Sequence, residues 1–178
     1  SNILYRYISS SKSYKRVSNV IDKLNGSRYY FYDANGNRRT SSGWKKVNGS
    51  TAYYVCDGGY VTSRYTDQKG TKKVYDFDYS KNTWVQKKNM WKTVYRSRYY
   101  FGSKGVATIS YNNSTKKAYK FTGRKWKPAK KLIMKIGNAN YYFNSAAKRV
   151  VKAGKYKTAD GYIAYVNRRG VVYKREYD

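Results

Sequence analysis

The chain has 178 residues, of which 39 are Lys or Arg and 9 are Asp or Glu, so its formal net charge is +30. It has no His and a single Cys, which leaves a zinc site almost without ligands and excludes an intramolecular disulfide. High charge with few aliphatic residues is typical of disorder, but 24 Tyr and 4 Trp supply rings that can be buried while their polar tips stay hydrated. The composition therefore predicts a folded chain with a core built largely of tyrosine.

Short aromatic strands recur along the chain every 20 to 24 residues. They end at Ile8, Phe31, Val55, Phe77, Phe101, Phe121, Phe143 and Val166. Each is followed by a turn signal rich in Gly, Asn or Asp, and then by a second short strand, which is typical of a β-hairpin. The sequence predicts an all-β fold of tandem β-hairpin repeats of about 22 residues, paired into modules of about 44. Stacked hairpins and small Src-homology-3-like barrels both satisfy this spacing.

The whole chain, 1–178, is expected to be one repeat region. Its expected modules are 1–42, 43–70, 71–114 and 115–178. The best helical candidate is the segment from Lys15 to Leu24, although no long 3.6-residue pattern supports it.

Alternation along each strand assigns its two faces. In three-residue motifs such as Tyr29-Tyr30-Phe31, the first and third residues are predicted to face the core. The middle residues are predicted to face solvent, because charge occurs among them. They are Tyr30, Tyr54, Asp76, Tyr100, Lys120, Tyr142 and Tyr165.

Basic residues occur in every repeat and predict a surface for a polyanion, because nothing within the chain offsets a net charge of +30. The predicted cationic binding residues are Arg38, Arg39, Lys45, Lys46, Lys72, Lys73, Lys116, Lys117, Lys130, Lys131, Arg168 and Arg169. The predicted aromatic binding residues are Tyr30, Trp44, Tyr54, Trp91, Tyr100, Trp126 and Tyr142. Phosphate polymers of two kinds fit this pattern, namely nucleic acid and teichoic acid.

Catalysis is not expected, because the chain has no imidazole to act as a general base. A cell-wall hydrolase is nevertheless kept as an alternative, in which Asp76 and Asp78 would be the catalytic carboxylate pair. No cofactor and no metal site are predicted. No stretch approaches the ~18 apolar residues of a transmembrane helix, so no membrane span is expected.

The segment 43–55 reads Gly-Trp-Lys-Lys-Val-Asn-Gly-Ser-Thr-Ala-Tyr-Tyr-Val. It resembles the units of choline- and glucan-binding cell-wall repeats, which form stacked β-hairpins. The basic character and the doubled period are more similar to the surface-layer protein attachment domains (SLAP type) of lactobacilli. Residues 29–39, 53–63, 74–85 and 141–152 carry that pattern, so the resemblance covers most of the chain.

The resemblance implies non-covalent anchoring of a surface-layer or surface-associated protein to an anionic wall polymer, with teichoic or lipoteichoic acid as the expected polymer. The implied location is extracellular, in the cell wall or S-layer of a Gram-positive cell. Self-association through other domains of the parent protein would be compatible with it. The many Lys and Arg residues argue against choline, which is itself a cation. A nucleic-acid-binding protein is the main alternative.

Overall fold

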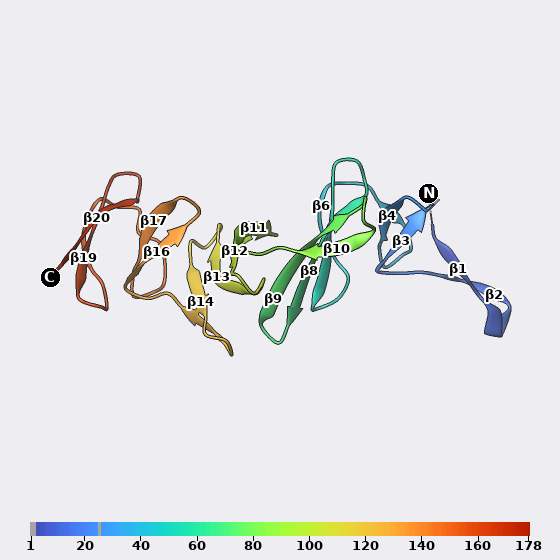
Figure 1. Cartoon of the computed structure of the whole chain (residues 1–178), viewed down its shortest axis with the longest axis horizontal. Helices are drawn as coiled ribbons and strands as arrows, with labels where there is room; N and C mark the ends of the chain where they lie inside the picture. Colours follow the sequence, from blue (N-terminus) through green and yellow to red (C-terminus); the bar gives the residue numbers. More distant parts are fainter. Residues whose placement is uncertain (1–2, 25) are drawn as a thin grey trace. The chain divides into compact units, whose positions relative to one another are not determined.

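The computed structural model describes residues 3–24 and 26–178, and the fold is all-β as predicted (Figure 1). One 3₁₀ turn, Ser9–Ser11, is the single helical element in these ranges. In the first part of the chain the strands are β1 (Tyr5–Ile8), β2 (Ser13–Arg16), β3 (Val20–Leu24), β4 (Arg28–Tyr32), β5 (Arg38–Arg39), β6 (Gly43–Lys46), β7 (Thr51–Val55), β8 (Val61–Gln68), β9 (Thr71–Asp78) and β10 (Thr83–Gln86). The remaining strands are β11 (Met90–Val94), β12 (Ser97–Phe101), β13 (Ala107–Asn112), β14 (Ala118–Phe121), β15 (Trp126–Pro128), β16 (Leu132–Ile136), β17 (Ala139–Phe143), β18 (Gly154–Lys157), β19 (Tyr162–Val166) and β20 (Val172–Tyr177).

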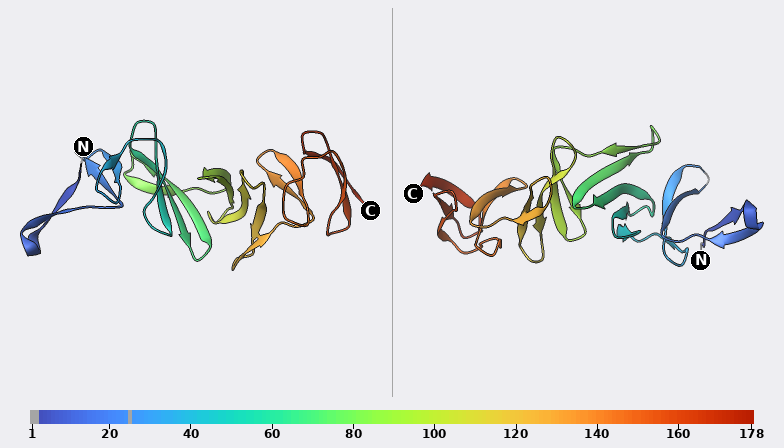
Figure 2. Two further views of the ribbon diagram at one scale, coloured as in Figure 1. Left: turned by 180° about the vertical axis from the view of Figure 1, so that it is seen from behind. Right: turned by 90° about the horizontal axis from the view of Figure 1, so that it is seen from below.

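The chain divides into two compact units, Ser1–Lys88 and Asn89–Asp178. The first contains the hairpin β1-β2, the sheet β3-β4-β5 and the five-stranded sheet β10-β9-β8-β7-β6. The second contains the five-stranded sheet β11-β12-β13-β14-β15, the hairpin β16-β17 and the sheet β18-β19-β20. Every strand pair is antiparallel and joins neighbours in the sequence, which makes each sheet an open meander of hairpins (Figure 2).

These sheets cross two of the predicted module boundaries. The strands β6–β10 form one sheet from residue 43 to residue 86, so the hairpin β8-β9 runs through the boundary at 70/71, and the hairpin β13-β14 of the sheet β11–β15 runs through the boundary at 114/115. The modules of about 44 residues remain a prediction about repetition in the sequence.

The helix predicted for Lys15 to Leu24 is wrong. This segment ends β2 and forms β3, which pairs with β4 through Val20 opposite Tyr32 and Ile21 opposite Phe31. Two adjacent β-branched residues favour the pleated strand. Before them, Asn19 adopts a left-handed conformation with a φ of 49°, which is incompatible with a continuous helix.

Five hairpins share one turn geometry. The backbone N–H of the fourth turn residue donates to the carbonyl of the first, and the N–H of the first donates to the carbonyl of the fifth. The first residues are Asp33, Cys56, Gly102, Asn144 and Asn167. The fourth residues are Gly36, Gly59, Gly105, Ala147 and Gly170, and all have φ between 58° and 74°. This left-handed position explains why Gly recurs at it, with Ala147 as the one exception among the five.

The same glycines allow close contact between successive repeats. A Cβ on Gly36 would lie 2.7 Å from Cγ of Arg16 and 2.8 Å from the carbonyl oxygen of Val17. A Cβ on Gly170 would lie 3.0 Å from the carbonyl oxygen of Val150. The turns that contain Gly36 and Gly170 therefore pack against the backbone of the preceding repeat in the sequence.

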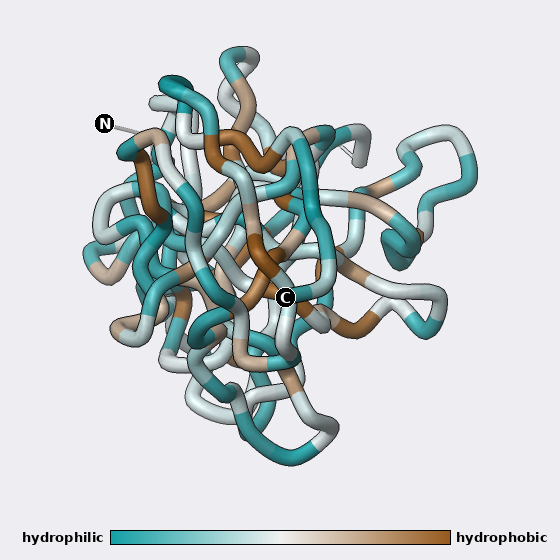
Figure 3. The backbone as a smooth tube through the Cα atoms, turned by 90° about the vertical axis from the view of Figure 1, so that its left-hand side faces the viewer, coloured by the Kyte–Doolittle hydropathy of each residue, from teal (hydrophilic) through white to brown (hydrophobic). Residues whose placement is uncertain are grey.

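The apolar clusters also lie between hairpins. In the first unit, Phe31 of β4 packs with Val55 and Val61, which flank the next turn. In the second unit, one cluster joins β13 and β14 to β16 and β17, and another joins β17 to β19 and β20. Figure 3 shows the corresponding short apolar stretches separated by polar ones. The predicted core column is confirmed in part. At its third position Phe31, Val55, Phe101, Phe143 and Val166 are buried, but Phe77 and Phe121 are half-buried, and at its first position Ala164 is buried while the tyrosines are half-buried.

Tyrosine hydroxyls add polar links between these hairpins. The Tyr79 hydroxyl donates to the carbonyl of Val61 (2.5 Å) and accepts from the N–H of Tyr29 (3.2 Å), so it joins the β9-β10 turn region to β4 and β8. In the second unit, the Tyr142 hydroxyl donates to the carbonyl of Lys157 (2.9 Å) while its ring stacks on Tyr156. Tyrosine thus supplies both the apolar ring and the partner for backbone groups between hairpins.

We expect Gly36→Ala to lower the free energy of unfolding of the first unit by about 1–3 kcal/mol, because it combines a left-handed φ with a contact to backbone. Gly49→Ala is the matched control, since a Cβ there has no atom within 4 Å and should change stability by less than about 0.5 kcal/mol. Urea unfolding followed by circular dichroism compares the two. Equal effects would contradict the packing of this turn on the preceding repeat.

Burial raises the pKa of Tyr79, so its neutral form stabilises the fold. This contribution is fully present below the ordinary tyrosine pKa of about 10 and is lost as pH rises through the higher pKa of the folded state. We expect Tyr79→Phe to cost about 1–2 kcal/mol at pH 7 through the lost hydrogen bonds. It should also make the loss of stability above pH 10 less steep. Stability measured from pH 7 to 11 tests both, with Tyr14→Phe, whose side chain is 71% exposed, as control. If Tyr79→Phe did not change how steeply the free energy of unfolding falls with pH above 10, the proposed contribution of the neutral Tyr79 hydroxyl would be contradicted.

Candidate functional site

A tryptophan and a tyrosine face each other across the first two strands of each five-stranded sheet. Trp44 of β6 is opposite Tyr54 of β7, and Trp91 of β11 is opposite Tyr100 of β12. Both pairs have ring centroids 5.5 Å apart, with interplanar angles of 65° and 51°. All four rings are half-buried, so each retains exposed surface. The structure therefore brings together four of the predicted aromatic binding residues as two equivalent pairs.

The rows that contain these pairs differ between the two sheets. In the second unit, Tyr100 is opposite Ile109, Ile109 is opposite Lys120, and Lys120 is opposite Lys127, so the row ends in two cations. In the first unit, Tyr54 is opposite Ser63, which is opposite Asp76 and donates a hydrogen bond to it (2.7 Å). The row of the second unit thus combines aromatic rings with cations, whereas the row of the first unit carries a carboxylate at the corresponding position.

A cavity of about 320 Å³ lies against the pair in the second unit. We call it the aromatic pocket, and its lining residues are Trp91, Tyr100, Ile109, Lys135 and Gly137. The first three come from the sheet β11–β15, and the last two come from the next hairpin. An aromatic wall beside an ammonium group suits a sugar or polyol that carries an anionic group.

Arg98 of β12 adds a second cation beside this pocket. Its guanidinium carbon lies 5.5 Å from the centroid of the Trp91 ring. A Cβ on Gly137 would come within 3.0 Å of Nη2 of Arg98, so a glycine there leaves room for the guanidinium. The pocket therefore carries positive charge from two successive hairpins.

The other predicted aromatic residues have different surroundings. The Arg38 guanidinium lies 5.0 Å from the centroid of the Tyr30 ring, which joins two predicted site residues. Trp126 packs against Phe121 and Tyr99, with ring centroids 5.3 Å and 6.2 Å away. Tyr142 was predicted to face solvent, and this is wrong: it is buried at 5% exposure because the following hairpin stacks on it.

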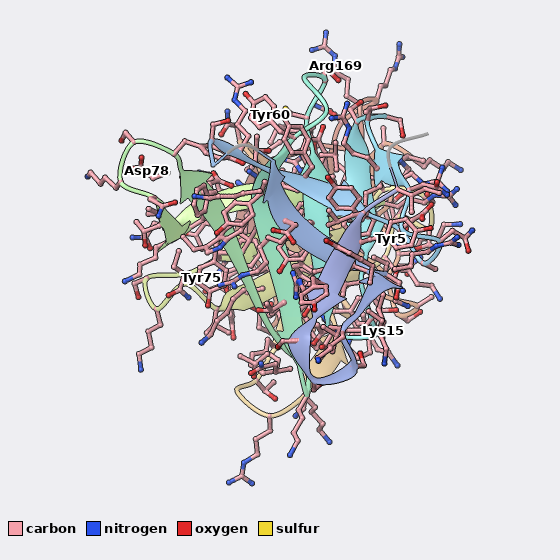
Figure 4. All side chains as sticks on the ribbon, turned by 90° about the vertical axis from the view of Figure 1, so that its right-hand side faces the viewer. Tyr5, Lys15, Tyr60, Tyr75, Asp78 and Arg169 are labelled. Atoms are coloured by element: carbon pink, nitrogen blue, oxygen red, sulfur yellow. The ribbon has the colours of Figure 1, made fainter. Side chains whose placement is uncertain are left out.

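The predicted cations are mostly accessible, and nitrogen-tipped side chains project from the surface in Figure 4, where Lys15 and Arg169 are labelled. Exposed members are Arg39, Lys46, Lys116, Lys117, Lys130, Lys131, Arg168 and Arg169. Half-buried members are Arg38, Lys45, Lys72 and Lys73. Two of the twelve pair with carboxylates of this chain: Arg39 with Asp33 (2.6 Å) and Lys72 with Asp67. The structure leaves the predicted cations spread over many hairpins.

Most acidic residues already have basic partners within the chain. Besides Asp33 and Asp67, ion pairs join Arg6 to Asp22, Lys87 to Asp76, Lys157 to Asp178 and Lys174 to Glu176. With nine carboxylates against 39 basic side chains, internal pairing can neutralise only a small share of the positive charge. The remainder must be balanced by salt ions or by a ligand.

The two carboxylates considered for hydrolysis have structural contacts. Asp76 accepts from Ser63 and pairs with Lys87 at 3.3 Å. Asp78 accepts hydrogen bonds from the Ser80 hydroxyl and from the N–H groups of Ser80 and Lys81, and these bonds lower the pKa of Asp78. Both carboxylates therefore fix strand and turn geometry.

Several residues near the cavities were missed from the sequence. Arg98 and Lys135 were not singled out, although a lone cation inside the apolar stretch Leu132–Ile136 was a usable signal. The guanidinium of Arg64 lies 4.6 Å from the Tyr75 ring centroid and 4.9 Å from that of Trp84, a stack formed across three strands. Such contacts depend on strand register, which the repeat pattern does not reveal.

No group of three or more His, Cys, Asp or Glu side chains within the described ranges could hold a metal ion. None of the described helical structure has the length and apolarity to cross a membrane.

No protein-family model matches the chain, and no curated protein matches it. Among solved structures, alternansucrase in complex with isomaltononaose is similar over 98% of this chain and 16% of its own, at 18% identity and a TM-score of 0.32. Choline binding protein F from Streptococcus pneumoniae, in the presence of a peptidoglycan analogue, is similar over 97% of this chain and 53% of its own, at 22% identity and a TM-score of 0.26. CbpJ from Streptococcus pneumoniae TIGR4 is similar over 94% and 62%, at 16% identity and a TM-score of 0.25. The chain covers less than two thirds of each, and we rest no functional argument on likenesses this weak.

Proposed function

We propose that this chain anchors a protein non-covalently to the bacterial cell wall by binding an anionic wall polymer, with teichoic or lipoteichoic acid as the ligand class. The parent would be a surface-layer or surface-associated protein outside a Gram-positive cell. The observation that carries the proposal is the aromatic pocket, where Trp91 and Tyr100 lie beside Lys135 and Arg98.

The charge of the chain supports an anionic ligand. Positive side chains outnumber negative ones by 30, and many of the few carboxylates already form ion pairs within the chain. A polyanion would relieve the self-repulsion of such a surface and would be attracted to it over several ångströms. Binding of this kind weakens steeply as salt rises.

The aromatic pocket supports a ligand that also has an apolar or hydroxylated face. A cavity with a ring wall and neighbouring cations can hold a sugar or polyol on the rings and a phosphate at Lys135. The pocket is open to solvent, so a single repeating unit of the polymer bound there would have modest affinity. Weak sites repeated along one polymer gain affinity through their high effective concentration.

The resemblance of segment 43–55 to wall-binding repeats, and of the wider chain to SLAP-type domains, points to the same class of ligand. Cations in its pockets favour the SLAP-type resemblance over the choline-binding one, because a choline site would have to accept a cation. Nucleic acid is the competing ligand, since it would also use Lys, Arg and exposed rings.

The decisive experiment measures binding of the whole chain to purified Gram-positive cell walls before and after acid extraction of teichoic acid. DNA of matched charge serves as competitor. We expect binding that disappears on extraction, resists DNA and weakens with rising salt. Binding that survives extraction would contradict an anionic polymer as ligand, and binding to DNA alone at physiological salt would favour the nucleic-acid alternative.

Variants test the aromatic pocket itself. We expect Trp91→Ala to weaken wall binding by about tenfold, in the range of losses for a stacking ring. Lys135→Gln should weaken it less and should reduce its salt dependence. The controls are Tyr14→Ala and Lys15→Gln on the exposed hairpin β1-β2. Losses in the controls as large as those in the pocket variants would show that total charge and exposed rings, rather than this pocket, determine binding.

A further inference from the structure

A second cavity in the same unit, also of about 320 Å³, is lined by several charged groups. We call it the basic pocket, and its lining includes Lys120, Lys130, Thr158, Ala159, Asp160 and Arg175. Three of these side chains are cationic and one is a carboxylate. The aromatic pocket is a separate cavity with no lining residue in common.

Hydrogen bonds between the segments that line the basic pocket hold it in shape. The N–H of Ala159 donates to the carbonyl of Lys131 (2.6 Å), which ties the β18-β19 turn to the segment before β16. The hydroxyl of Thr158, buried at 5% exposure, donates to the carbonyl of Tyr162 (2.9 Å) and accepts from the N–H of Tyr162 (2.8 Å). The turn that carries Asp160 is thereby fixed on both sides.

The cations of this pocket come from three different strands or connections. Lys120 lies on β14, in the row that begins with Trp91 and Tyr100 and continues to Lys127 of β15. Lys130 lies between β15 and β16, and Arg175 lies on β20 with its guanidinium carbon 3.6 Å from the centroid of the Tyr162 ring. Convergence of three cations from separate segments on one hollow suits the oxygens of a phosphate group.

Asp160 makes this pocket different from a plain anion site. The adjacent Thr158 side chain and the nearby charges of Arg175 and Lys120 lower the pKa of Asp160, so it is ionised at neutral pH. An ionised carboxylate only accepts hydrogen bonds, and it repels a ligand that is anionic along its whole length. A ligand with hydroxyl groups next to its phosphate would satisfy both kinds of group.

We propose that the basic pocket binds one phosphodiester of a polyol phosphate, with Lys120, Lys130 and Arg175 on the phosphate oxygens and Asp160 accepting hydrogen bonds from adjacent hydroxyls. This inference rests on the proposed function and narrows its ligand class. It makes Asp160 the residue that favours a hydroxylated phosphate polymer over inorganic polyphosphate. The same carboxylate disfavours DNA, whose sugars lack the 2′-hydroxyl.

The test uses the whole chain and two probes of equal charge, a glycerol phosphate oligomer and inorganic polyphosphate, at one fixed salt concentration. Titration calorimetry gives both affinities, and the readout is their ratio. We expect the unmodified chain to prefer the glycerol phosphate. Lys120→Gln and Lys130→Gln should each weaken binding of both probes by about fivefold, as expected for one charged contact to phosphate.

Asp160→Ala should strengthen binding of polyphosphate while leaving glycerol phosphate unchanged or weaker, so the preference falls. Asp57→Ala, an exposed carboxylate in a turn of the first unit, is the matched control and should leave the ratio unchanged. Circular dichroism confirms that each variant is folded.

Four results would overturn the inference. Equal gains for both probes in Asp160→Ala would mean that Asp160 acts only through its charge. Losses in Lys120→Gln and Lys130→Gln no larger than in Lys15→Gln would mean that the phosphate binds elsewhere, while wall anchoring itself could still hold. A chain that binds walls but neither probe would reject the polyol phosphate and leave the anchoring function standing. A chain that binds neither walls nor probes would reject both proposals.

Discussion

Packing between successive hairpins is the interaction on which the rest of this structure depends. An isolated two-stranded β-hairpin buries too little apolar surface to be stable in water. Here Phe31 packs on Val55 and Val61 of the next hairpin, and Tyr142 packs with Ala164 and Val166. The turn glycines and the tyrosine hydroxyls serve the same junctions. Stability is consequently distributed over many small contacts between neighbours in the sequence.

This construction also explains how a chain of such high charge folds. Because the cores are small and lie at the junctions, most of each hairpin remains exposed and can carry Lys and Arg. Tyrosine suits these junctions, since its ring is buried while its hydroxyl reaches a backbone group of the adjacent hairpin, as Tyr79 does with Val61. The same junctions leave cavities between hairpins, and both pockets described above include residues from more than one hairpin.

The binding features differ in how far they could be predicted. Tyr54 and Tyr100 were predicted to face solvent, and Trp44 and Trp91 were predicted as binding residues. Their pairing across neighbouring strands depends on strand register and was not predicted. The exposed basic residues were also predicted. Arg98, Lys135 and Asp160 were missed, since nothing in their immediate neighbours indicates which hairpin they will meet. Tyr142 was placed wrongly because alternation assigns a face to each side chain but does not show which faces a later hairpin covers.

The all-β class, the hairpin period, the turn positions and the excess of positive charge could be predicted from the residues alone. These properties follow from local rules, namely alternation along a strand, the left-handed glycine of the turn and the count of ionisable groups. Which rings are buried, which cations converge and where the cavities lie became evident from the folded chain. These properties depend on strand register and on contacts between different hairpins, which short degenerate repeats do not specify.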